Sequence, residues 1–229
     1  MGQCFPTCFL PLLIFIKDNP RISLTPPSDD KLLKIIDFLT RKNINSKRNK
    51  DISFIELFPD KTLIEKKFDQ FISNLKIIKG RRNAFIYFIG EIIDNIYEHS
   101  MFSIAYIMAR EEKNKNFTEL AFIDNGISIP GSYEQEGFHF SNIEALQQAL
   151  KGLSTKNDER GYGLRTSLNL LIKGFDAECL LISRRAVLIG HKNDRTFFNL
   201  QKNNIFSRTL LSTRIPHNNK EVNVYDYIE

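Results

Sequence analysis

The sequence of 229 residues contains only three cysteines, Cys4, Cys8 and Cys179. An odd number of cysteines with no second pair fits neither a disulfide framework nor a four-ligand metal site. We therefore expect a protein of the reducing cytoplasm.

The sequence also lacks a hydrophobic run long enough to cross a membrane. The longest run near the start, CFLPLLIFI at residues 8–16, is too short to span a bilayer, contains Pro11 and follows no basic residue of the kind that opens a secretion signal. This run is interpreted as a buried strand or a docking segment, and no membrane span is expected.

Charge of one sign is only slightly in excess. The 32 Lys and Arg residues exceed the 27 Asp and Glu residues by five, which permits an anionic partner without naming one. Nucleotide, nucleic acid and acidic protein all remain open. The densest basic stretch, residues 41–50, is typical of a solvated linker, with a nucleic-acid contact as the alternative.

Hydrophobic spacing divides the chain into a helical part and a strand-rich part. Helical spacing covers residues 30–42, 62–78 and 83–100, and a strand is expected at 21–24. The remaining expected elements are a hairpin (102–110 with 118–124), a short helix (141–151), a helix from Gly163 to about residue 173, and a meander (178–183, 186–190, 196–201 and 209–216).

This order of elements predicts an α+β fold, a two-layer α/β sandwich. Its helices should cover one face of a mixed, largely antiparallel sheet, with a cleft between the layers. We expect a small α/β extension of unknown role at residues 1–60, followed by the main domain at residues 61–229.

A line of polar residues runs along the otherwise apolar helix 83–100. Glu91, Asn95 and Glu98 are spaced by four and three residues, and His99 lies beside them. The line faces either water or a cleft. In a cleft, the glutamate could orient and deprotonate a water molecule, and the amide oxygen could bind Mg²⁺, which prefers oxygen ligands.

Two glycine-containing segments follow this helix. FIDNGISIP (122–130) ends an apolar strand in Asp-Asn-Gly, and ERGYGLRTS (159–167) opens a helix. Each is weak alone, since Asp-Asn-Gly is a common turn and Gly-x-Gly is frequent. Together with EIIDNIYEHS (91–100), they resemble in order and spacing the N box and two glycine boxes of the GHKL family of ATP-binding domains.

The resemblance spans residues 83–216 and is nearest in motif style to histidine-kinase-like and anti-sigma-factor-like domains. It implies the Bergerat-type fold and the binding of ATP and Mg²⁺ as cofactors. The closing strand, RTLLSTRIP, also resembles the family's, although Arg208 stands where glycine is usual. The first eighty residues are not covered.

The resemblance also implies roles for individual residues. Glu91 would be the catalytic base, and Asn95 would bind the metal. Asp124 would accept a hydrogen bond from the adenine amino group. The residues expected to bind the cofactor are Asn95, Asp124, Gly126, Ile129, Lys156, Arg160, Gly161, Tyr162, Gly163, Leu164 and Thr209.

The leading hypothesis is a Mg²⁺-dependent ATP-binding protein that hydrolyses ATP or transfers phosphate to a partner protein. The alternatives are a non-catalytic nucleotide-dependent interaction switch and a nucleic-acid-binding protein without a nucleotide site. Whether the chain forms a homodimer is left open by the sequence. Self-phosphorylation on histidine is not expected, because residues 62–78 contain no histidine and no upstream segment resembles a phosphoacceptor helix.

Overall fold

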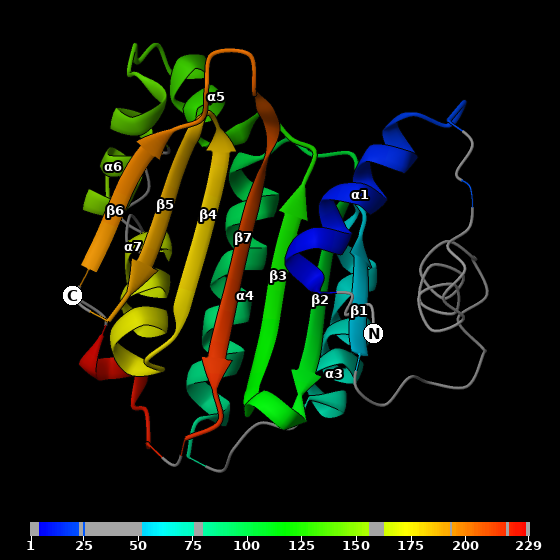
Figure 1. Cartoon of the computed structure of the whole chain (residues 1–229), viewed down its shortest axis with the longest axis vertical. Helices are drawn as coiled ribbons and strands as arrows, with labels where there is room; N and C mark the ends of the chain where they lie inside the picture. The colour runs from blue at the N-terminus through cyan, green and yellow to red at the C-terminus, as the bar shows by residue number, and fades with distance from the viewer. Residues whose placement is uncertain are drawn as a thin grey trace.

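A seven-stranded sheet organises the molecule in this computed structural model, which describes residues 5–22, 25, 52–75, 80–155, 163–192, 194–218 and 220–227. The strand order is β1-β2-β3-β7-β4-β5-β6 (Figure 1). The strands are β1 (Ile52–Leu57), β2 (Ala105–Glu112), β3 (Phe117–Asp124), β4 (Glu178–Arg184), β5 (Ala186–His191), β6 (Asp194–Asn199) and β7 (Phe206–Pro216). All six pairings are antiparallel, so the α+β prediction is confirmed but the sheet is not mixed.

The predicted hairpin and the first three strands of the predicted meander are present. β2 pairs with β3, and the connection ends at Asn116, whose φ of 56° suits a short polar side chain. The strands β4, β5 and β6 follow one another as expected. The last strand, β7, does not extend the meander at its edge but lies between β3 and β4, in the middle of the sheet.

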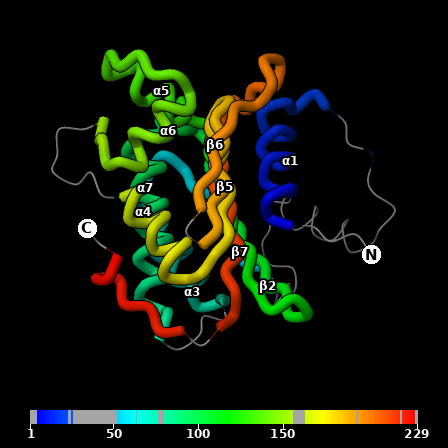
Figure 2. The backbone as a smooth tube through the Cα atoms, turned by 60° about the vertical axis from the view of Figure 1, so that its left-hand side comes forward, coloured from blue at the N-terminus to red at the C-terminus, as the bar shows by residue number. Residues whose placement is uncertain are grey.

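Most helices cover one face of the sheet, here called the front (Figure 2). They are α3 (Ile64–Asn74) after a 3-10 turn (Lys61–Leu63), α4 (Arg82–His99), α5 (Ser128–Gln135), α6 (Asn142–Lys151) and α7 (Gly163–Asn169), which continues as a π-helical turn (Leu170–Gly174). Two further 3-10 turns are Lys113–Lys115 and Val224–Asp226. The apolar stripe of α4 is buried as expected, and its Phe88 meets Phe122 of β3 edge to face, with 5.8 Å between the ring centres.

The opposite face, here called the back, carries α1 (Pro6–Asp18). This helix contains the run at residues 8–16, which was interpreted as a buried strand or a docking segment; the strand alternative is wrong. Pro6 occupies the first turn, where its missing N–H is not needed. Phe9, Leu10, Leu13 and Ile14 then recur at helical spacing. They pack against the sheet residues Tyr106, Met108, Ala121, Ile123 and Leu210.

Several other expectations differ from the structure. None of the elements expected from the sequence covers residues 128–135, yet α5 forms over Ser128–Gln135. Both α1 and β1 precede residue 60, the expected domain boundary, and both belong to the same sheet assembly. The predicted helix 30–42 and residues 23 and 24 of the predicted strand 21–24 lie outside the described residues, and residues 21 and 22 are not in a strand. Among the helices described, none is both long and apolar enough to cross a membrane.

Candidate functional site

A cavity of about 150 Å³ opens between the front helices and the sheet, roughly ten times the ~10–15 Å³ that one water molecule needs. Six residues predicted to bind the cofactor line it: Asn95, Asp124, Ile129, Gly163, Leu164 and Thr209. They come from α4, the end of β3, α5, α7 and β7. The folded chain therefore brings the three motif segments to one place.

Asp124 is the most buried charged group of this cavity. It ends β3 with only 4% of its surface exposed. The Gly126 backbone N–H donates to its carboxylate at 2.9 Å. Burial outweighs this bond and the influence of the nearby Ser100 hydroxyl, and it raises the pKa of Asp124 to about 7. The group therefore exists in both protonation states near neutral pH.

Gly126 holds the turn after β3 against the end of α4. A Cβ atom at this position would lie 2.0 Å from the Ser100 carbonyl oxygen, so no larger residue fits without moving the turn. The Ile127 N–H donates to the same oxygen at 2.7 Å. Gly126 itself does not line the cavity, although it was predicted to lie near the ligand. Its part is to fix the turn that supports Asp124.

A row of short polar side chains crosses the ends of three strands. Asp124 of β3 pairs with Thr209 of β7, and Thr209 pairs with Ser183 of β4. The Thr209 and Ser183 hydroxyls are 3.1 Å apart, and the Ile129 N–H donates to Ser183 at 2.9 Å. Ser183 was not predicted. The sequence shows only that a serine ends the apolar strand 178–183. The pairing of β4 with β7, which brings Ser183 next to Thr209, cannot be seen in the sequence.

The polar line on α4 reaches the cavity at Asn95. Its side-chain amide donates to the Glu91 carbonyl at 2.7 Å. A Cβ on Gly163 would lie 3.2 Å from the Asn95 Oδ1 and 3.3 Å from a Glu91 carboxylate oxygen. Glu91 does not line the cavity. Burial, and then the Glu91 charge and a hydrogen bond to it, raise the pKa of Tyr87 one turn earlier.

Hydroxyl groups and a histidine form the wall opposite the sheet. The Thr155 hydroxyl lies 3.0 Å from Nδ1 of His99 and 3.0 Å from the Ser132 hydroxyl. These three residues join α4, α5 and the segment after α6 across the cavity. Thr155 and Ser132 were not predicted, because neither lies in a recognisable motif.

Four predicted cofactor-binding residues, Lys156, Arg160, Gly161 and Tyr162, lie outside the described residues. Within the described part of the chain, no group of three or more His, Cys, Asp or Glu side chains could hold a metal ion. A metal at this site would therefore need oxygen donors beyond those side chains, such as the Asn95 amide and the ligand itself.

Comparisons with protein-family models, with curated proteins and with solved structures found no match.

Proposed function

We propose that this chain is a Mg²⁺-dependent ATP-binding protein of the histidine-kinase-like ATPase class, which hydrolyses ATP or transfers phosphate to a partner protein. The supporting observation is that residues of three GHKL-like segments meet at one cavity, which the buried carboxyl group of Asp124 helps to line. A buried carboxyl group that lines a cavity is costly for folding, which favours a role in binding.

The proposed contact with the base rests on hydrogen-bond direction. The ionised Asp124 carboxylate accepts hydrogen bonds, and the exocyclic amino group of adenine donates them. Guanine carries a carbonyl oxygen at that position, which would face the carboxylate without a proton. Phe122, Leu181 and Leu211 give the cavity an apolar floor suited to a flat base.

The proposed metal and phosphate contacts lie near Glu91 and Asn95, in the middle and second half of α4. Because the Asn95 Nδ2 donates to the Glu91 carbonyl, its Oδ1 is the atom left for a cation, and Mg²⁺ prefers such oxygen ligands. Bound Mg²⁺ would neutralise phosphate charge. Gly163 has no side chain between these groups and the cavity, where a Cβ would crowd both Asn95 and Glu91.

Glu91 is the proposed general base. Its carboxylate lies one helical turn before Asn95 and close to Gly163, so it is directed at the phosphate end rather than the base end of the site. There it would accept the proton of an attacking water molecule or of an acceptor hydroxyl on a partner protein.

Calorimetric titration with ATP tests the proposal. Asp124→Ala should lower ATP affinity by about 10–100-fold, the range for a hydrogen bond to a charged group. Asp94→Ala is the matched control, since Asp94 is an exposed carboxylate of α4 that pairs with Lys61. The control should bind ATP as the wild type does. The proposal fails if the wild type does not bind ATP, or if a natively folded Asp124→Ala variant binds it equally well.

A further inference from the structure

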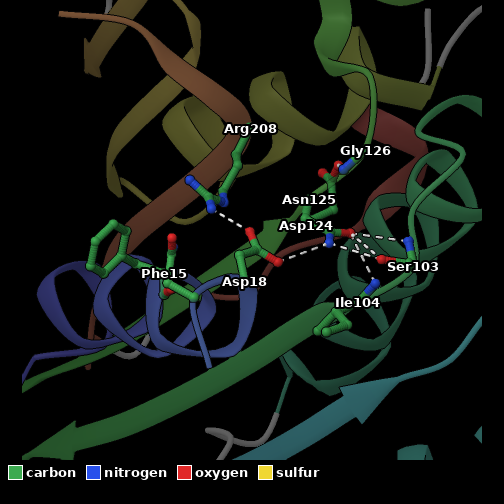
Figure 3. Close-up of polar contacts among 9 residues, drawn as sticks. Phe15, Asp18, Ser103, Ile104, Asp124, Asn125, Gly126 and Arg208 are labelled. Atoms are coloured by element: carbon green, nitrogen blue, oxygen red, sulfur yellow. Dashed lines mark hydrogen bonds and ion pairs between the residues drawn. The ribbon is translucent and has the colours of Figure 1, made fainter. Parts of the chain in front are cut away.

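We propose that Asp18, the last residue of α1, is a positioning residue for the cavity on the other side of the sheet. It links the two residues that directly adjoin Asp124 and Thr209, namely Asn125 and Arg208 (Figure 3). The effect on ATP affinity rests on the proposed function, whereas the effect on the turn after β3 does not.

The alternation of side chains in a sheet explains how a helix on the back can act on the front. Asp124 and Thr209 form the last pair of the β3–β7 ladder and line the cavity. Asn125, which follows Asp124, and Arg208, which precedes Thr209, are the next residues along the two strands. Their side chains therefore point to the back, where α1 lies. The Asp18 carboxylate forms an ion pair with Arg208 and accepts a hydrogen bond from the Asn125 amide at 3.4 Å.

Asn125 in turn fixes the chain that supports Asp124. Its Oδ1 accepts the backbone N–H groups of Ser103 at 3.0 Å and Ile104 at 2.9 Å, just before β2. Its own N–H donates to the Ile104 carbonyl at 3.1 Å. The next residue, Gly126, donates to the Asp124 carboxylate. A shift of Asn125 would therefore also move Gly126, whose N–H donates to the Asp124 carboxylate.

Arg208 strengthens the dependence on Asp18. Its side chain is only 16% exposed, and Asp18 is the carboxylate that pairs with it. In the described part of the chain its Nε has no hydrogen-bond partner. Without Asp18, a largely buried guanidinium would lose its counter-charge, and such groups move toward water at the expense of local structure. A movement of Arg208 would reach the cavity directly, because the next residue, Thr209, lines it.

The other end of α1 is held independently. The Thr7 N–H and hydroxyl both donate to the buried Glu119 of β3, at 3.0 and 2.5 Å. Asp18, in contrast, sits at the helix C-terminus, where a negative charge is unfavourable for the helix itself. Asp18→Ala should therefore leave α1 helical and remove only the link, whereas Thr7→Val weakens the docking of α1 far from the cavity.

Amide hydrogen exchange in the nucleotide-free protein tests the link. In Asp18→Ala, exchange at Ser103 and Ile104 should accelerate by about tenfold or more, since both amides depend on Asn125, while exchange between β4 and β5 stays unchanged. Thr7→Val should leave Ser103 and Ile104 within about twofold of the wild type. Unchanged exchange in Asp18→Ala, or equal acceleration in both variants, would overturn the proposal.

ATP affinity tests whether the link sets the site. Asp18→Ala should weaken binding by about 5–20-fold, a usual range for coupling between distant positions, and Thr7→Val by less than about twofold. Faster exchange in Asp18→Ala with unaltered ATP affinity would show that the site does not depend on Asp18, and would reject the positioning role. If the wild type does not bind ATP, the proposed function fails, and the exchange data alone decide whether Asp18 holds the turn.

Discussion

At the scale of single residues, the buried carboxyl group of Asp124 connects binding with stability. Burial raises the pKa of Asp124 to about 7 in the folded protein, from an ordinary value of 3.8. Between these two values the folded chain holds a proton that the unfolded chain has lost. The free energy of unfolding therefore decreases as pH rises from about 4 to about 7, because the unfolded state binds fewer protons.

Replacing Asp124 by asparagine should remove this pH dependence, since the amide does not titrate. The free energy of unfolding of Asp124→Asn, minus that of the wild type, should increase by on the order of 4 kcal/mol between about pH 4 and pH 8. Urea denaturation at a series of pH values measures this difference, in which the contributions of other groups cancel. A difference that is constant with pH would show that Asp124 titrates normally.

Glu91 separates an enzyme from a nucleotide-dependent switch. Glu91→Gln should keep ATP affinity within a few-fold, because the side chain lies near Gly163 at the proposed phosphate end. Turnover should fall by roughly 100-fold or more, a usual contribution of a general base. Single-turnover assays measure this turnover. They use ATP labelled in its γ-phosphate, with and without cell extract as a source of acceptor protein.

The fate of the label identifies the reaction. Label in inorganic phosphate indicates an ATPase, and label on a foreign protein indicates a kinase. Equal inactivity of wild type and Glu91→Gln, with ATP bound by both, would contradict the catalytic role of Glu91 and favour the switch.

At the scale of elements, α1 is part of the sheet's packing rather than an appendage. Ile14 is fully buried against the back face, whereas Leu12 on the same helix is 42% exposed. Ile14→Ala should lower the free energy of unfolding by about 2–4 kcal/mol through lost burial and the cavity left behind. Leu12→Ala should change it by less than about 0.5 kcal/mol. Chemical denaturation of both variants checks this, and equal effects would show that α1 does not dock as described.

The sequence predicts elements best where one face alone is buried. The helix expected at residues 83–100 agrees closely with α4, and the β2–β3 hairpin follows from its apolar strands and polar turn. α1 was misread because residues 6–16 carry no charged side chain to mark a solvent face. The position of β7 beside β3 could not be predicted, because local periodicity contains no information about which strands pair.

At the scale of the whole molecule, the fold assembles a site from residues far apart in the sequence. Motif residues such as Asn95, Asp124 and Gly163 could be nominated from the sequence, because each lies in a pattern with a chemical use. Ser183 and Thr155 could not, since their neighbours come from other strands and helices. The link from Asp18 to Asn125 joins residues 107 positions apart in the sequence, on the back of the sheet.

The most direct test of the proposed ATP site compares three nucleotides on the wild-type protein by calorimetry with Mg²⁺ present. They are ATP, GTP and purine riboside triphosphate, which lacks only the exocyclic amino group of ATP. If Asp124 accepts a hydrogen bond from that group, ATP should bind about 10–100-fold more tightly than purine riboside triphosphate, and GTP should bind still more weakly. Equal affinity for ATP and purine riboside triphosphate, or no binding of any of the three, would contradict the account.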